Sequence, residues 1–272
     1  MIESRAAKAR ARDGCLLAYR IYPQPDKARL VLIHSLALDA SIWDGVAAKL
    51  NVDAEILVYD CRGHGQSERR AGTYTQRLFA EDLAVILDHC EWPSAFVAGC
   101  SMGGCVAQAF GDAFPERTRG LGLIDTTAWY GPEARADWRK RAETAAEKGF
   151  AAMLPFQVTR WFGDGFRAAH ADVVEAVSRV FLAGDLACYQ SSCALLGSAD
   201  LRSALGSLRM PVSVIVGEED YATPVAMAHA LHDAIPGSTL TVIRGGRHLT
   251  PIENSGEIAE LLRDLLSRGK HN

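Results

Sequence analysis

Ser101 stands in the most informative pattern of this chain, the sequence Gly-Cys-Ser-Met-Gly over residues 99–103. An apolar run precedes the pattern and a helix-like run follows it, so we expect the serine on a sharp turn between a strand and a helix. Gly99 and Gly103 leave the backbone room for that turn because neither carries a side chain. Such a turn lifts the hydroxyl clear of the sheet and points a helix N-terminus at the group under attack. The pattern therefore predicts a nucleophilic serine.

A nucleophilic serine needs a base, and the base needs a carboxylate that orients it. Asp220 follows one late strand-like run, and His248 follows the next one in a glycine-rich loop. Serine, acid and histidine in this chain order form one of the orders that catalytic triads adopt. We therefore predict a triad of Ser101, Asp220 and His248. Glu218 and Glu219 are the alternatives to Asp220; if they are not the triad acid, they are solvated charges of the loop.

The composition is typical of a globular enzyme. The chain has 272 residues, of which 49% are hydrophobic and 23% charged, enough to bury a sizeable core. A net charge of -4 argues against a nucleic-acid partner. No apolar run approaches about 18 residues, so we expect no membrane partner. The basic segment 5–12 lacks the apolar region of a signal peptide and is interpreted as a frayed terminus.

Seven cysteines occur without any Cys-x-x-Cys pair. An odd number without such a pair favours reduced thiols in a cytoplasmic protein over a disulfide framework or a zinc site. The cytoplasm is therefore the expected location.

Strand-like and helix-like segments alternate along most of the chain. Strands are predicted at 16–22, 30–34, 55–59, 95–98, 121–124, 212–216 and 240–243. Helices are predicted near 41–50, 74–90, 102–114, 224–234 and 252–266. Apolar strands that alternate with amphipathic helices indicate an α/β fold with a mostly parallel sheet covered on both faces.

Residues 132–208 break this alternation, because helix-like segments follow one another there without a strand. They are predicted at 132–148, 150–162, 165–182 and 186–205. We expect a helical cap domain over 132–208, inserted after the sixth strand and set over the carboxyl edge of the sheet, where open α/β sheets bind ligands. The core domain would then consist of 1–131 and 209–272.

Several further motifs carry a family resemblance. They are His34-Ser35-Leu36, the segment 59–67 (Tyr-Asp-Cys-Arg-Gly-His-Gly-Gln-Ser), the serine motif at 99–104, Arg160-Trp161-Phe162, the segment 199–202 (Ala-Asp-Leu-Arg), and His248-Leu249 with Glu253. With these motifs the chain resembles the α/β-hydrolase superfamily over nearly its full length. Within it, the chain looks most like the 3-oxoadipate enol-lactonase group.

The resemblance implies a role for each site residue. Ser101 would be the nucleophile, His248 the base and Asp220 the residue that orients the base. The backbone amides of Leu36 and Met102 would form the oxyanion hole. No metal and no organic cofactor would be needed.

One departure from the dicarboxylate lactonases bears on the substrate. A basic residue is expected soon after the sixth strand in that group, where this chain has Thr-Ala-Trp-Tyr-Gly at 127–131. The aromatic pair predicts a less anionic or an aromatic substrate. Five aromatic residues are candidates for the pocket wall, with packing inside the cap as the alternative: Trp129, Tyr130, Trp138, Trp161 and Tyr189. Three arginines are interpreted as solvated charges, with a substrate-carboxylate role as the alternative: Arg135, Arg141 and Arg160.

These observations predict a serine hydrolase that cleaves an ester or lactone bond of a small-molecule substrate through an acyl-enzyme. A carbon–carbon bond hydrolase of the same fold is one alternative, although that group usually has Trp after the catalytic histidine, where this chain has Leu249. A ligand-binding receptor on a hydrolase scaffold is another, since fold does not fix function. The oligomeric state stays open, with a homodimer among the options.

Overall fold

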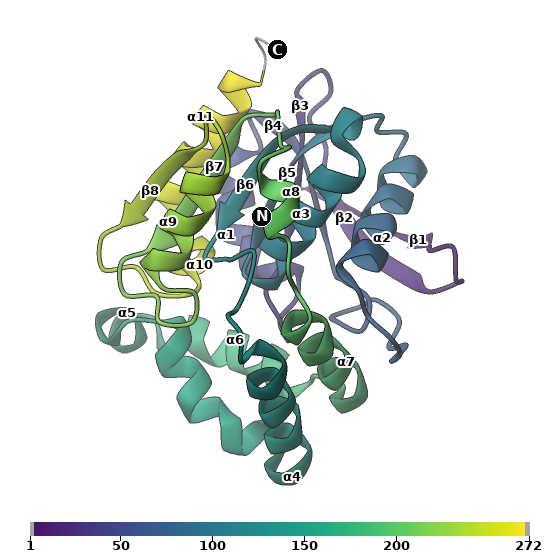
Figure 1. Ribbon diagram of the computed structural model, residues 1–272. Helices are drawn as coiled ribbons and strands as arrows, with labels where there is room; N and C mark the ends of the chain where they lie inside the picture. Colours follow the sequence, from purple (N-terminus) through teal and green to yellow (C-terminus); the bar gives the residue numbers. More distant parts are fainter. Residues whose placement is uncertain (1–2, 270–272) are drawn as a thin grey trace.

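The computed structural model describes residues 3–269, so the first two and last three residues of the predicted core domain lie outside the described part. Within it, eight strands form one sheet in the order β1-β2-β4-β3-β5-β6-β7-β8 (Figure 1). Among these strands β2 alone runs against the rest, and the pairs from β4 to β8 are parallel. Their bounds are β1 Arg5–Arg10, β2 Leu16–Tyr22, β3 Ala28–Ile33, β4 Ala54–Tyr59, β5 Ala95–Cys100, β6 Thr118–Ile124, β7 Val212–Gly217 and β8 Thr239–Ile243.

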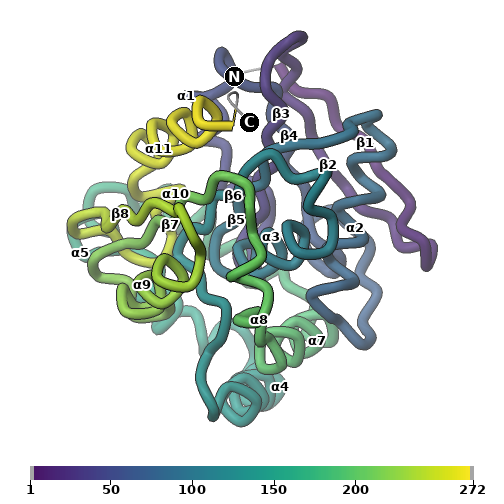
Figure 2. The backbone as a smooth tube through the Cα atoms, turned by 45° about the horizontal axis from the view of Figure 1, so that its top comes forward, coloured from purple at the N-terminus to yellow at the C-terminus, as the bar shows by residue number. Residues whose placement is uncertain are grey.

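Helices cover both faces of the sheet (Figure 2). On one face lie α1 (Asp44–Leu50), α10 (Thr250–Glu253) and α11 (Ser255–Arg268); on the other lie α2 (Gln76–His89), α3 (Met102–Ala113) and α9 (Val225–Ala234). Short 3-10 turns precede α1 and β6, at Ala40–Trp43 and Pro115–Arg117. Every residue of β5 and β7 is buried, as two-sided coverage requires. The mostly parallel α/β sheet predicted from sequence is confirmed.

The structure contains all seven predicted strands and adds an eighth. Residues interpreted from sequence as a frayed basic terminus form the edge strand β1, which pairs with β2 through a turn at Asp13 and Gly14. Gly14 has a φ of +88°, which only glycine adopts without strain. Strand pairing uses backbone groups, so the charged side chains of β1 extend into solvent without opposing it.

The segment between β6 and β7 is helical, as predicted. It comprises α4 (Ala134–Trp161), α5 (Asp164–Ala169), α6 (Ala171–Leu182), α7 (Leu186–Gly197) and α8 (Arg202–Leu205). The helices α4 to α7 gather at one end of the sheet (Figure 1), whereas α8 packs against α3 and α9. The expected break between 148 and 150 is confirmed at Gly149, whose φ of 73° and ψ of 166° interrupt α4. The segment predicted as one helix over 186–205 is two helices, because Asp200 leaves the helical path to form a β-bridge with Trp129.

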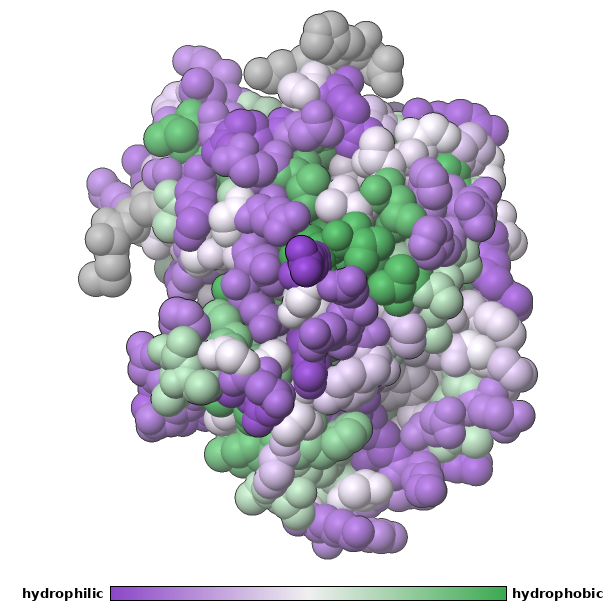
Figure 3. Space-filling view, turned by 90° about the vertical axis from the view of Figure 1, so that its left-hand side faces the viewer, coloured by the Kyte–Doolittle hydropathy of each residue, from purple (hydrophilic) through white to green (hydrophobic). Residues whose placement is uncertain are grey.

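Polar residues dominate the surface seen in Figure 3, with hydrophobic side chains in smaller groups between them. Within residues 3–269 no single helix is both long and apolar enough to cross a membrane. Only α6 and α7 taken together meet those criteria of length and composition, and they meet at a bend of 96°.

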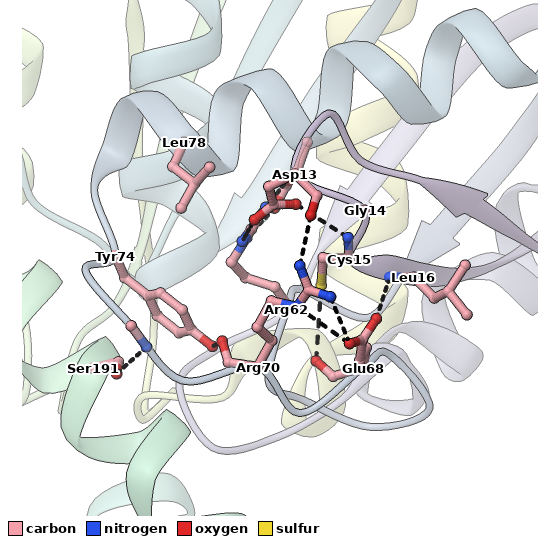
Figure 4. Close-up of polar contacts among 12 residues, drawn as sticks. Asp13, Gly14, Cys15, Leu16, Arg62, Glu68, Arg70, Tyr74, Leu78 and Ser191 are labelled. Atoms are coloured by element: carbon pink, nitrogen blue, oxygen red, sulfur yellow. Dashed lines mark hydrogen bonds and ion pairs between the residues drawn. The ribbon is translucent and has the colours of Figure 1, made fainter.

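A buried ion pair fastens the β1–β2 turn and α2 to the loop after β4 (Figure 4). Arg62 donates from Nε to Asp82 Oδ2 and from Nη2 to Asp82 Oδ1, both over 2.6 Å, and from Nη1 to Asp13 Oδ2 over 2.8 Å. The Arg62 and Asp82 side chains are 3% and 4% exposed. Burial raises the pKa of the Asp82 carboxyl, although Arg62 acts against that shift. The loop therefore depends on a charge pair with little access to water.

Removal of one charge from this pair should be costly. Asp82→Ala leaves Arg62 buried with Asp13 as its remaining partner, so we expect the free energy of unfolding to fall by about 3–5 kcal/mol. Asp53→Ala is the matched control, since Asp53 pairs with Arg263 over 2.8 Å at side chains that are 35% and 36% exposed. That control should lose about 0–1 kcal/mol. Urea unfolding followed by circular dichroism measures both, and equal losses would contradict the assignment.

Candidate active site

Ser101 occupies a strained turn between β5 and α3. Its φ of 56° and ψ of -114° lie outside the regions that non-glycine residues favour. Both backbone groups of Ser101 are hydrogen-bonded to the neighbouring segment. Ser101 N donates to Ile124 O over 2.9 Å, and Thr126 Oγ1 donates to Ser101 O over 2.7 Å. A Cβ on Gly103 would lie 2.3 Å from Ile33 O, and one on Gly99 would lie 2.1 Å from Gly103 O. The two glycines thus permit the close approach that the turn requires.

Ser101, His248 and Asp220 meet at the carboxyl ends of three strands. The hydroxyl of Ser101 lies 3.0 Å from His248 Nε2, and His248 Nδ1 lies 2.8 Å from Asp220 Oδ2. All three residues are buried, with exposures of 6%, 5% and 3%. The sequence separates them widely, and the parallel sheet brings them into one hydrogen-bonded line.

The carboxylate of Asp220 is fully engaged. Its Oδ1 accepts from Ala222 N and Thr223 N over 2.7 and 3.0 Å, and its Oδ2 accepts from Thr223 Oγ1 over 2.8 Å as well as from the imidazole. Burial alone would raise the pKa of Asp220, but the neighbouring His248 and the hydrogen bonds from Thr223 outweigh burial and hold it below its ordinary value. The carboxylate is therefore kept ionised.

The two alternative acids point elsewhere. Glu218 Oε2 accepts from Gly245 N over 2.9 Å, and Glu219 Oε2 pairs with Arg247 Nε over 3.2 Å. Neither carboxylate is hydrogen-bonded to His248 within the described residues. Of the three acids in this loop, Asp220 alone faces the imidazole.

A second buried carboxylate, which the sequence analysis did not single out, braces the acid and base loops. Asp125 Oδ1 accepts from Gly217 N over 3.0 Å, and Asp125 Oδ2 accepts from Thr250 N and Oγ1 over 3.0 and 2.7 Å. Burial and the charge of Asp220 raise the pKa of Asp125. Its position directly after a predicted strand was the available signal, since the other site residues follow strands in the same way.

The two predicted oxyanion donors lie beside the serine. Met102 is the first residue of α3, where a backbone N–H has no partner inside the helix. Leu36 lines the same cavity as Ser101, after β3. His34 shapes this loop, because its Nδ1 donates to Ser35 O over 2.7 Å while its Nε2 accepts from Cys61 N over 2.9 Å.

The two histidines near this loop are hydrogen-bonded to backbone groups. His64 Nδ1 donates to Arg62 O over 3.0 Å. Burial lowers the pKa of His34 and lowers that of His64 to about 3, so both imidazoles are neutral near pH 7. They hold the loop rather than titrate in it.

A small cavity of about 20 Å³ lies over Ser101 and His248. Among the five aromatic candidates, Tyr130, Trp138 and Trp161 line it. Tyr189 lies outside the lining, with its hydroxyl accepting from Arg141 Nε over 2.7 Å. Trp129 also lies outside, since its ring stacks under the guanidinium of Arg202 at 3.8 Å. The aromatic wall is therefore built mainly by α4.

Two of the three arginines that were interpreted from the sequence as solvated charges lie at the cavity. Arg141 and Arg160 both line the cavity, whereas Arg135 is exposed. Within residues 3–269 neither cavity arginine has a carboxylate within ion-pair distance. Burial and the charge of Arg141 lower the pKa of Arg160. Which of the three arginines reach the cavity depends on how α4 packs against the core, which the sequence pattern does not contain.

Gln157 adds an uncharged donor to the same wall. It is 1% exposed, it lines the cavity, and its Nε2 has no hydrogen-bond partner. A buried amide without a partner is costly unless a ligand supplies one. Arg141, Gln157 and Arg160 thus line the same cavity. Residues 157 and 160 are three positions apart, a spacing that places both on one face of a helix, and this was the available signal in the sequence. Within the described residues, no group of three or more His, Cys, Asp or Glu side chains could hold a metal ion.

The close packing of the serine turn can be tested by adding one methyl group. Gly103→Ala should lower the free energy of unfolding by about 1–3 kcal/mol or more, because its Cβ would overlap the Ile33 carbonyl. Gly165→Ala is the control in α5, since nothing lies within 4 Å of its Cβ position. It should be neutral or stabilising by up to about 1 kcal/mol. Thermal and urea unfolding compare the two, and a neutral Gly103→Ala would refute the packing argument.

Comparisons with known proteins agree with this geometry. A family model described as alpha/beta hydrolase fold matches residues 28–255. The chain is 34% identical over 237 residues to 3-oxoadipate enol-lactonase 2 of Acinetobacter baylyi, covering 87% of this chain and 88% of that protein.

Solved structures give the same result. An enol-lactonase from Burkholderia xenovorans superposes with a TM-score of 0.91 at 29% identity, covering 96% of this chain and all 100% of that one. A thermophilic esterase from Thermogutta terrifontis superposes with a TM-score of 0.90 at 26% identity, covering 97% and 99%. The fold, the strand-ending site residues and these matches lead to one conclusion: the chain belongs to the α/β-hydrolase family.

Proposed function

We propose that this protein is a serine hydrolase that cleaves an ester or lactone bond of a small molecule through an acyl-enzyme on Ser101. The observation that carries the proposal is the buried hydrogen-bonded line from Asp220 through His248 to Ser101, which ends at a small cavity. The enol-lactonase and esterase names of its relatives support the same chemistry.

Each residue of the line has one task. His248 Nε2 takes the proton of Ser101 Oγ as that oxygen attacks the carbonyl carbon, and it later gives the proton to the leaving oxygen. Asp220 accepts the Nδ1 hydrogen, which fixes the imidazole tautomer and stabilises the imidazolium. The backbone amides of Leu36 and Met102 stabilise the oxyanion. Water activated by His248 then releases the acid and restores Ser101.

The cavity wall supports a substrate with a carboxylate near the scissile bond. Two guanidinium groups and the free amide of Gln157 face that space, and all lack an anionic partner in the described residues. A carboxylate accepts bidentate hydrogen bonds from arginine, so it satisfies these donors together. A substrate with one carboxylate remains compatible with the less anionic substrate that the aromatic pair after β6 predicted.

We further propose that residues 132–208 act as a cap over the site, since α4 and α6 contribute Trp138, Arg160 and Phe181 to the cavity wall. We assign the protein to the cytoplasm on the ground of its seven free cysteines.

The acid can be tested through its pH behaviour. Because the pKa of Asp220 lies below its ordinary value of about 3.9, the carboxylate is ionised throughout the range from about pH 5 to 8. Asp220→Asn should therefore lower kcat by a similar factor, about 10⁴-fold, at every pH in that range. Ser101→Ala should lose about 10⁴-fold or more.

Hydrolysis of para-nitrophenyl butyrate across this pH range measures both variants. Glu218→Gln is the control, because it removes a neighbouring carboxylate that binds Gly245 instead of His248. Near-normal turnover by Ser101→Ala, or equal damage from Glu218→Gln and Asp220→Asn, would contradict the triad. A single slow turnover followed by a lasting complex would favour a receptor over an enzyme.

The charge preference can be tested with two matched esters. Para-nitrophenyl hemisuccinate carries a carboxylate where para-nitrophenyl isocaproate carries two methyl groups. Arg160→Met should lower kcat/KM for the hemisuccinate by about 10- to 100-fold and for the isocaproate by much less, because only the anion loses a charged hydrogen bond. Arg135→Met, an exposed arginine on the same helix, should leave both unchanged. Equal losses on both esters would argue against a carboxylate subsite.

A further inference from the structure

The carbonyl of Thr159, near the end of α4, accepts two hydrogen bonds from the core. Tyr221 Oη donates to it over 2.6 Å, and Arg247 Nη1 donates to it over 2.7 Å. The last carbonyls of a helix lack partners inside the helix. A guanidinium near them also interacts favourably with the negative end of the helix dipole. We refer to Thr159 O, Tyr221 and Arg247 together as the Thr159 junction.

Both donors stand next to residues of the site in the chain. Tyr221 directly follows Asp220, and Arg247 directly precedes His248. Arg247 is fixed on its other side by Glu219, with its Nε 3.2 Å from Glu219 Oε2, and its guanidinium lies 5.4 Å from the centre of the Tyr221 ring. The loop that carries Asp220 and the loop that carries His248 therefore both donate a hydrogen bond to the carbonyl of Thr159.

The acceptor also adjoins the cavity wall. Arg160, the next residue, lines the cavity, and so does Trp161. Two more hydrogen bonds join the residues that follow Arg160 to the core. Leu249 N donates to Trp161 O over 3.2 Å, and Gly163 N donates to Glu253 Oε1 over 2.9 Å. A shift of Thr159 against these loops would move the guanidinium of Arg160 relative to Ser101.

We propose that Tyr221 and Arg247 are positioning residues that set Arg160 against the triad and so determine the selectivity for anionic acyl groups. The proposal rests on the carboxylate subsite of the proposed function. Neither residue lines the cavity, so each acts through Thr159 and Arg160. The preference for an anion depends on orientation, because a bidentate hydrogen bond requires the guanidinium plane to meet the carboxylate plane.

Other contacts between the helical insertion and the core provide a comparison. Arg69 Nη2 donates to Ala183 O over 3.0 Å, and Gln76 Nε2 donates to Leu195 O over 2.8 Å. Neither acceptor lies in the segment that carries Arg160 and Trp161. Arg69→Met thus removes one arginine-to-carbonyl contact of the same kind without touching the Thr159 junction.

The test measures the ratio of kcat/KM for para-nitrophenyl hemisuccinate to that for para-nitrophenyl isocaproate. Tyr221→Phe should lower this ratio about 5-fold and Arg247→Met about 10-fold, mainly through a higher KM for the anion. Arg247→Lys keeps a donor for Thr159 O and should recover part of the loss. Arg69→Met should leave the ratio unchanged.

A double-mutant cycle separates positioning from general loosening. In an Arg160→Met background Tyr221→Phe and Arg247→Met should no longer change the ratio, because the residue through which they act is gone. An unchanged ratio in the single variants would overturn the proposal. So would an equal loss with and without Arg160.

Hydrogen exchange keeps the inference separable from the proposed function. A wild-type protein without preference for the hemisuccinate would contradict the carboxylate subsite, and the junction would then be judged by amide exchange over residues 158–163. Faster exchange there in Tyr221→Phe, with unchanged exchange over 183–195, supports the Thr159 junction as the clamp on this segment. Unchanged exchange at both segments would refute it.

Discussion

Parallel pairing of β3, β5, β6, β7 and β8 is the constraint on which the site depends. Carboxyl ends of parallel strands meet at one edge of a sheet, so loops distant in the chain arrive at the same place. Ser101, Asp220 and His248 each follow one of these strands, and they form a continuous hydrogen-bonded line there. A slip of one residue in β5, β7 or β8 would move the site residue that follows it by about 3.3 Å along the sheet and separate the line.

Burial gives this line its properties. Asp220 is deeply buried yet ionised, because the imidazole and three donors of its own loop surround its two oxygens. Burial and the nearby charge of Asp220 raise the pKa of Asp125, whereas the pKa of Asp220 is lowered. Asp125 also accepts hydrogen bonds from Gly217 N and Thr250 N. Charged groups with satisfied hydrogen bonds stiffen an interior that would be costly to loosen.

The helical insertion supplies polar side chains to the cavity wall. Arg141, Gln157 and Arg160 lie along α4 and face the cavity without an anionic partner in the described residues. Burial and the nearby guanidinium of Arg141 both lower the pKa of Arg160. An anionic substrate would act against that shift. The strand ends thus carry Ser101, Asp220 and His248, and α4 carries the three donors of the cavity wall.

The sequence by itself determined the features that depend on local pattern. Apolar periodicity located seven strands, the glycines around Ser101 located the turn, and the break at Gly149 followed from a residue without a side chain. Only the tertiary structure decided what depends on contacts between distant segments. Backbone pairing made β1 a strand despite its charged side chains, and the direction of α4 turned Arg160 inward while Trp129 packed against Arg202. Which face of a helix meets a cavity is set by packing against other elements, and the local pattern of polar and apolar residues does not contain that information.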